Sequence, residues 1–163
     1  MCYNSRKTMD KQQLLETWQI NNRINLYLLD AIPAEHLGDT MSSKGRSAGE
    51  QLAHLHNVRL MWLKAAAPEL LDGSVKIEKE RSTDKALIAE CLASSGAAIE
   101  RLLESAIENG GKVKGFKPHV TGFLGYLTAH DAHHRSQAII ALKQNGHQLD
   151  KKILYGIWEW GSR

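Results

Sequence analysis

Three histidines, His130, His133 and His134, lie within five residues in the stretch YLTAHDAHHRSQ at positions 126–137. His130 and His134 are four residues apart, so in a helix their side chains stack one turn apart on one face. Two imidazoles held in this way can bind one divalent metal ion. Metal chemistry is therefore the first hypothesis to test against the rest of the chain.

The apolar stripe of this helix indicates which of the histidines face the core. Successive residues are rotated by about 100°, so the residues within about 80° of His130 on one side can be counted. They are His134 and four apolar residues, Phe123, Leu127, Ala138 and Ala141. His133 falls on the other flank, beside Tyr126 and Ile140. We therefore predict that His130 and His134 point inward together.

A third inward histidine is predicted in the segment 47–66. His54 shares its side of that helix with Val58, Met61, Trp62 and Ala65, whereas His56 points almost the opposite way. We expect His56 and His133 at the surface or at an interface. Three neutral imidazoles with one open position form a catalytic zinc-type ligand set. A lone inward histidine is more often a hydrogen-bonded core residue, but three unpaired imidazoles are costly to bury, which favours a metal.

Other readings of the histidines are weaker. Residues 130–134 have the HExxH form of zinc peptidases, but Asp131 replaces the glutamate and lies about 100° from His130. A di-iron bundle needs Glu-x-x-His on two helices and two more carboxylates, and only fragments of that pattern occur. His36, His119 and His147 fall at loops or helix ends and receive no role in this interpretation.

The sequence predicts an all-α protein. Four long amphipathic segments are expected at about 10–30, 47–66, 82–109 and 119–145, and the three prolines fall between them. Ser47 and Glu50 form a capping-box pattern, and glycines follow the third and fourth segments. A short packed element is expected at 154–160. These segments favour a four-helix bundle, in which the connections 37–46 and 67–81 are long enough to cross over.

Composition limits the classes of partner. The 163 residues are 42% hydrophobic and 24% charged, as expected for one globular domain spanning 1–163. The net charge of +3 comes without basic blocks, so we expect no nucleic acid partner. No window approaches the roughly 20 apolar residues of a membrane span. Two unpaired-looking cysteines and the lack of an apolar signal segment favour a cytoplasmic protein.

The motifs SAGEQLAH at 47–54 and AHDAHHRSQ at 129–137, followed by LKQNG at 142–146, resemble the DinB/YfiT-like superfamily of bacterial metalloenzymes. Its late helix reads Asn-His-x-x-His-His-Arg-Gly-Gln, so Ala129 and Ser136 are departures. Segment order and length agree over nearly the whole chain. The resemblance implies a DinB/YfiT-like four-helix bundle with crossover connections, often a homodimer. It also implies zinc, nickel or iron at His54, His130 and His134.

The same resemblance implies an activity. Some members are thiol-dependent S-transferases or isomerases that use bacillithiol or mycothiol. We therefore expect a metal-dependent enzyme for a small-molecule substrate, with a low-molecular-weight thiol whose pKa the metal lowers. Gln137, Asn22 and Asn25 are candidates for substrate contacts. The alternatives are a metal-dependent hydrolase and a non-catalytic metal-binding or stress-related dimeric module. No obvious general base accompanies the histidines, which favours thiol chemistry or binding over hydrolysis.

Overall fold

The structure is a computed structural model that describes residues 2–42 and 44–163, with side chains described from residue 11 onward. Its long helices are α1 (Cys2–Ala31), α2 (Ala48–Ala66), α3 (Lys85–Glu108) and α4 (Val120–Gln144). A short helix α5 (Lys151–Gly156) follows, with 3-10 turns at Ala34–His36, Pro68–Leu70, Lys79–Arg81 and Trp160–Ser162. The described residues form two isolated β-bridges and no strand.

Local capping explains where three of the helices begin. The predicted capping box is present at α2, because Ser47 Oγ accepts from the Glu50 amide and the Ser47 amide donates to Glu50 Oε2. Asp84 caps α3. His119 caps α4, since its Nδ1 accepts from the Gly122 amide at 3.1 Å. The predicted bounds of α2, α3 and α4 hold to within three residues, while α1 and the tail helix α5 begin earlier than predicted.

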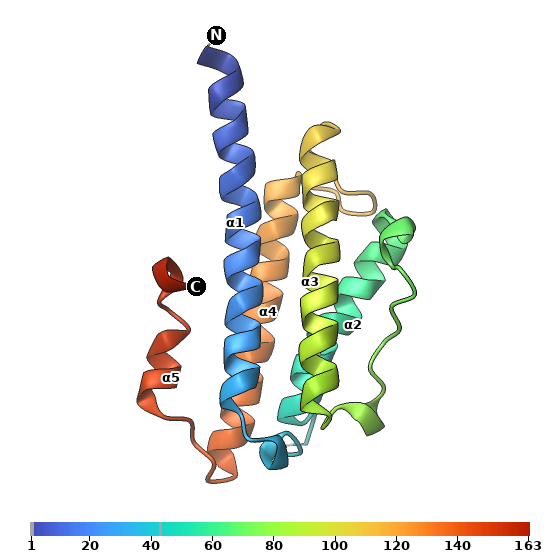
Figure 1. Cartoon of the computed structure of the whole chain (residues 1–163). Helices are drawn as coiled ribbons and strands as arrows, with labels where there is room; N and C mark the ends of the chain where they lie inside the picture. Colours follow the sequence, from blue (N-terminus) through green and yellow to red (C-terminus); the bar gives the residue numbers. More distant parts are fainter. Residues whose placement is uncertain (1, 43) are drawn as a thin grey trace.

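The four long helices form a bundle in which α1 and α2 each pack against both α3 and α4. In Figure 1, α1 and α4 run in one direction along the bundle and α2 and α3 run in the other. The segment between α2 and α3 therefore returns along the length of the bundle. The segment between α1 and α2 stays at one end. The all-α bundle is confirmed, and of the two long connections only the one after α2 crosses over.

The bundle interior has a polar layer between two apolar clusters. One cluster contains Trp18, Leu63 and Phe123, and the other contains Leu28 and Leu52. Between them along the helices lie buried polar side chains, among them Asn21, Asn25, Arg59, Asp131 and Arg135. Buried polar groups are costly unless they satisfy one another, so this layer constrains how α1, α2 and α4 align. No helix in the described part of the chain is long and apolar enough to cross a membrane.

Gly49 allows the first turn of α2 to lie against both neighbouring connections. Its amide donates to the carbonyl of Leu37 at 2.8 Å, and a Cβ at this position would overlap the backbone carbonyl oxygen of Ser82. A backbone atom cannot move aside as a flexible side chain can. The start of the helix that carries His54 is therefore positioned by a close backbone contact that only glycine permits.

We predict that Gly49→Ala lowers the free energy of unfolding by about 1–3 kcal/mol, because the added methyl forces the Ser82 backbone away. Urea unfolding at pH 7 measures the change. Gly125→Ala is the matched control, because Gly125 lies within α4 with no neighbouring atom within 4 Å. It should raise stability by up to about 1 kcal/mol through helix propensity. Equal effects of the two substitutions would show that the contact at Gly49 is unimportant.

Candidate metal centre

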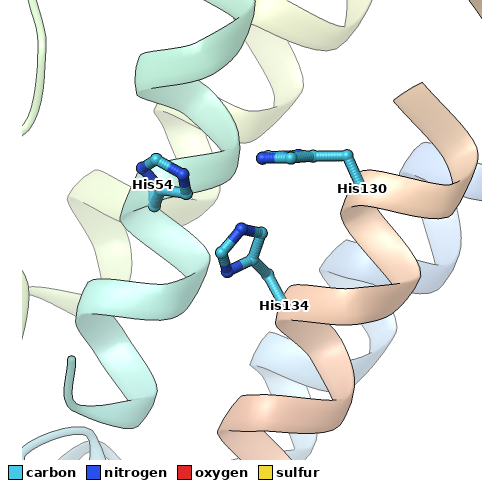
Figure 2. A group of neighbouring side chains, drawn as sticks. All are labelled: His54, His130 and His134. Atoms are coloured by element: carbon cyan, nitrogen blue, oxygen red, sulfur yellow. The ribbon is translucent and has the colours of Figure 1, made fainter. Parts of the chain in front are cut away.

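Three histidine rings converge between α2 and α4 (Figure 2). His54 comes from α2, while His130 and His134 come from successive turns of α4, and the three rings point toward one another. One ring nitrogen from each residue lies within 4.8 Å of the others. The ring planes are inclined by 46°, 68° and 58°, so nitrogen lone pairs, which lie in those planes, can meet at one point.

A neighbouring side chain orients the ring of His134, and a carboxylate lies near that of His130. His134 Nδ1 lies 2.6 Å from Gln51 Oε1, an oxygen that can only accept, so Nδ1 carries the proton and Nε2 keeps its lone pair. His130 Nδ1 is buried and lies 3.7 Å from Asp131 Oδ1, with no hydrogen-bond partner within the described residues. Second-shell acceptors of this kind set the tautomer and direction of metal-binding histidines. The donor set therefore fits a divalent transition metal.

The surroundings keep two of the imidazoles neutral. Burial, the charge of Arg46 and the neighbouring His130 lower the pKa of His54 to about 4. Burial lowers the pKa of His134 to about 3, and the neighbouring rings, of which His130 has the largest effect, contribute to this shift. A neutral imidazole is the form that binds a metal, because its lone pair is free. At pH 7 both residues are ready to act as ligands.

Asp131 anchors the helix that carries two of the three histidines. Its Oδ2 accepts from Arg59 Nη2 at 2.9 Å and from the amide groups of Asn21 and Asn25 at 2.8 and 2.7 Å. Burial by itself would raise the pKa of this carboxyl, but the charge of Arg59 and the nearby His130 hold it well below its ordinary value. Asp131 is therefore an ionised support that links α1, α2 and α4.

The structure corrects one expectation about these helices. His56, predicted at the surface or at an interface, is buried, with its ring nitrogens 3.0 Å from the carbonyl oxygens of Cys91 and Val75. Arg135, outside the histidine stripe, is also buried, and it donates to Asn21 and Asn25 in the polar layer. Both are enclosed because α2 and α4 are covered on more than one side. His133 is exposed, as predicted.

The predicted substrate-contact residues have different surroundings. Asn25 is buried and bonded to both Asp131 and Arg135, and Asn22 Oδ1 accepts from Arg59. Gln137 is half-buried on α4. Substrate contact by these three residues stays a prediction. Gln51, which supports the ring of His134, is not among the predicted site residues. It precedes His54 by three residues and so lies on the same helical face.

A second histidine group lies at the other end of α4, where His36, Asp39 and His147 also bring nitrogen and oxygen atoms within 4.8 Å. Here His147 Nδ1 is 2.6 Å from Asp39 Oδ2, and the two imidazole rings stack with centroids 3.5 Å apart and planes 18° apart. Nearly parallel rings cannot aim in-plane lone pairs at one ion. This group is therefore a hydrogen-bonded stack, unlike the inclined triad.

The two sides of the triad differ in chemistry. A polar cavity of about 170 Å³ includes His54 and Arg46. About two turns further along α2, Trp62 packs edge-on against Phe116, Phe123 and Tyr126, and the Tyr126 ring lies 6.2 Å from that of His130. A charged group on one side and an aromatic wall on the other can hold two chemically different molecules near the histidines.

The comparisons with known proteins agree with this architecture. The sequence profile of the DinB family matches residues 1–156. The chain belongs to the DinB family. Comparison with curated proteins and with solved structures gave no significant match. The helical bundle and the cluster of His54, His130 and His134 are thus those of a DinB family protein whose histidines are compatible with a metal site.

We predict that the metal-free protein loses stability as the pH falls from about 6.5 to 4. In this range the unfolded chain protonates histidines at their ordinary pKa near 6.5, whereas folded His54 and His134 stay neutral. Because the unfolded state binds more protons in this range, the free energy of unfolding decreases as the pH is lowered. Thermal unfolding of metal-free wild type and His134→Gln measures this. The variant should lose less stability than wild type, and the exposed-site control His133→Gln should behave as wild type.

We also predict that Asp131→Asn lowers the free energy of unfolding at pH 7 by about 3 kcal/mol or more, because it leaves the buried charge of Arg59 without its carboxylate. Urea unfolding in metal-free buffer is the measurement. Asp72→Asn is the control, since Asp72 is exposed in a loop and Asn tolerates its positive φ of 45°. A loss below about 1 kcal/mol for Asp131→Asn would contradict the anchoring role of Asp131.

Proposed function

We propose that this protein is a metal-dependent enzyme that transfers a low-molecular-weight thiol to an apolar electrophile. The observation that carries the proposal is the position of three converging histidines between a polar cavity that contains Arg46 and an aromatic wall. A divalent zinc, nickel or iron ion held by His54, His130 and His134 would lower the pKa of a thiol and favour the nucleophilic thiolate. The thiolate sulfur would bond to the electrophilic carbon as a leaving group departs.

The chain's own side chains have distinct tasks in this proposal. Gln51 holds the proton of His134 on Nδ1, and Asp131 holds the side of α4 that carries His130. Arg46, whose charge lowers the pKa of His54, would attract a thiol that bears carboxylate groups. The rings of Trp62 and Tyr126 would hold the apolar electrophile, because they extend the aromatic wall to His130.

The surroundings favour thiol transfer over hydrolysis. A hydrolase needs a free general base that can take a proton from water near the metal. The carboxylate nearest to His130 belongs to Asp131, which is buried and accepts three hydrogen bonds at Oδ2. Its depressed pKa also makes it a weak base. Thiol transfer needs no such base, because the thiolate itself is the nucleophile.

A homodimer is part of the proposal. Tyr126, His133 and Ile140 are spaced seven residues apart along α4, so they form one stripe, and all three are exposed. An exposed stripe with two large apolar residues suits an interface with a second copy. Light scattering coupled to size-exclusion chromatography should give twice the mass of one chain. The substitution Ile140→Glu should lower the measured mass toward that of a single chain.

We predict about one transition metal per chain in protein purified without a polyhistidine tag, as measured by plasma mass spectrometry. His54→Ala, His130→Ala and His134→Ala should each abolish stoichiometric binding, because each removes one of three ligands. His133→Ala and His147→Ala are the controls. The first changes an exposed neighbour and the second disrupts the stacked group, so both should retain the metal. Full binding in His54→Ala would contradict one site shared by α2 and α4.

Turnover is tested with cysteine, glutathione and bacillithiol against 1-chloro-2,4-dinitrobenzene. We expect metal-dependent product formation that chelation and His134→Ala abolish while far-UV circular dichroism remains unchanged. Arg46→Ala should raise KM for thiols with free carboxylates but leave KM for 2-mercaptoethanol unchanged, because only the former carry the complementary charge. Bound metal without turnover, together with a large loss of stability on chelation, would instead indicate a structural site.

A further inference from the structure

A separate cavity lies on the face of α4 that points away from the metal centre. Its volume is about 250 Å³, and it is closed on one side by α4 and on the other by the C-terminal segment. The α4 residues Thr128, Ala132, Arg135 and Ile139 share one helical face, roughly opposite to His130. In Figure 1, α5 and the C-terminal turn lie beside the bundle as a separate segment. This cavity is therefore distinct from the site proposed above.

Most of the cavity wall is apolar. Ile139 lines it from α4, and Ile157, Trp158 and Trp160 line it from the C-terminal segment. Trp158 is 76% exposed, which is unusual for the largest apolar side chain. Two indole rings and two branched aliphatic side chains suit a ligand with a flat or branched apolar body.

The inner end of the cavity carries positive charge that its surroundings compensate only in part. The polar layer holds two buried guanidinium groups, Arg59 and Arg135, but a single carboxylate, Asp131, whose close contact is with Arg59 at 2.9 Å. Arg135 instead donates through Nη1 to the neutral amide oxygens of Asn21 and Asn25.

A hydroxyl group beside this charge also lacks a partner. Thr128 lines the same cavity, and its Oγ1 is buried and makes no hydrogen bond to any of the residues that the structure describes. A buried hydroxyl without a partner costs free energy, which a ligand oxygen in the cavity would recover. Ser136 supplies a second hydroxyl in the lining. The polar groups thus match a small anion that can accept hydrogen bonds.

We propose that this cavity binds a small organic carboxylate with an aromatic or branched apolar body. The carboxylate would face Arg135 and Thr128, and the apolar body would lie between Ile139 and the indole rings of Trp158 and Trp160. The volume is slightly below the range of sites for drug-sized molecules, so the ligand is a small acid and not a peptide or nucleotide. The proposal does not depend on the thiol-transfer activity.

The experiment is calorimetric titration of the full chain with phenylacetate and 4-methylpentanoate, with phenylacetamide as the uncharged comparison. We expect saturable binding of at least one acid, and binding of the amide at least tenfold weaker. Binding should persist in His54→Ala, because the cavity lies on the other face of α4. No saturable binding of either acid, equal binding of the amide, or loss of binding in His54→Ala would each overturn the proposal.

Variants that leave the polar layer intact locate the site. Ala132→Leu fills the cavity and Trp158→Ala removes an exposed wall, and each should weaken acid binding at least tenfold. Tyr155→Ala is the matched control, because Tyr155 is similarly exposed on α5 but does not line the cavity. Unchanged binding in Ala132→Leu would place the acid elsewhere. If the protein binds no acid and self-associates, and Trp158→Ala converts it to a monomer, this face is instead an interface between copies of the chain.

Discussion

The buried carboxylate of Asp131 is the constraint on which much of this structure depends. An ionised group in the interior is stable only when donors surround it, and here Arg59, Asn21 and Asn25 all donate to one oxygen atom. These donors come from α1 and α2, whereas Asp131 lies on α4. The contact therefore links three helices in one register at the level between the two apolar clusters.

This alignment has a direct consequence for the histidines. Asp131 follows His130 in the chain, so drawing its side chain into the polar layer turns His130 and His134 toward α2. Gln51 completes the arrangement from the opposite helix, because its Oε1 accepts a hydrogen bond from His134 Nδ1. A hydrogen-bond acceptor behind an imidazole is typical of metal-binding histidines, because it sets the tautomer of the ring. The stacked pair of His36 and His147 lacks this inclination, although its nitrogen atoms are also close together.

The helix α4 thus has different chemistry on its different faces. Its histidine face looks toward α2, with Arg46 to one side and aromatic rings to the other. The opposite face, with Arg135 at its inner edge, lines a cavity beneath the C-terminal tryptophans. Asn21 and Asn25 contact both Asp131 and Arg135, so one hydrogen-bonded layer lies behind both faces. A four-helix bundle can support two such sites because each helix offers more than one side to its neighbours.

Sequence periodicity by itself determined the four long helices, the Ser47–Glu50 cap and the inward direction of His54, His130 and His134, because these depend on spacing along a single helix. It gave the wrong surroundings for His56 and did not reveal the burial of Arg135, since a helical wheel treats the side away from the apolar stripe as solvent. Only the tertiary structure placed His56 beneath the crossover segment, against the Val75 carbonyl, and Arg135 against α1. The distance between His54 and the α4 pair was likewise decided by helix packing, because contacts between segments far apart in the chain leave no periodic signal in either segment.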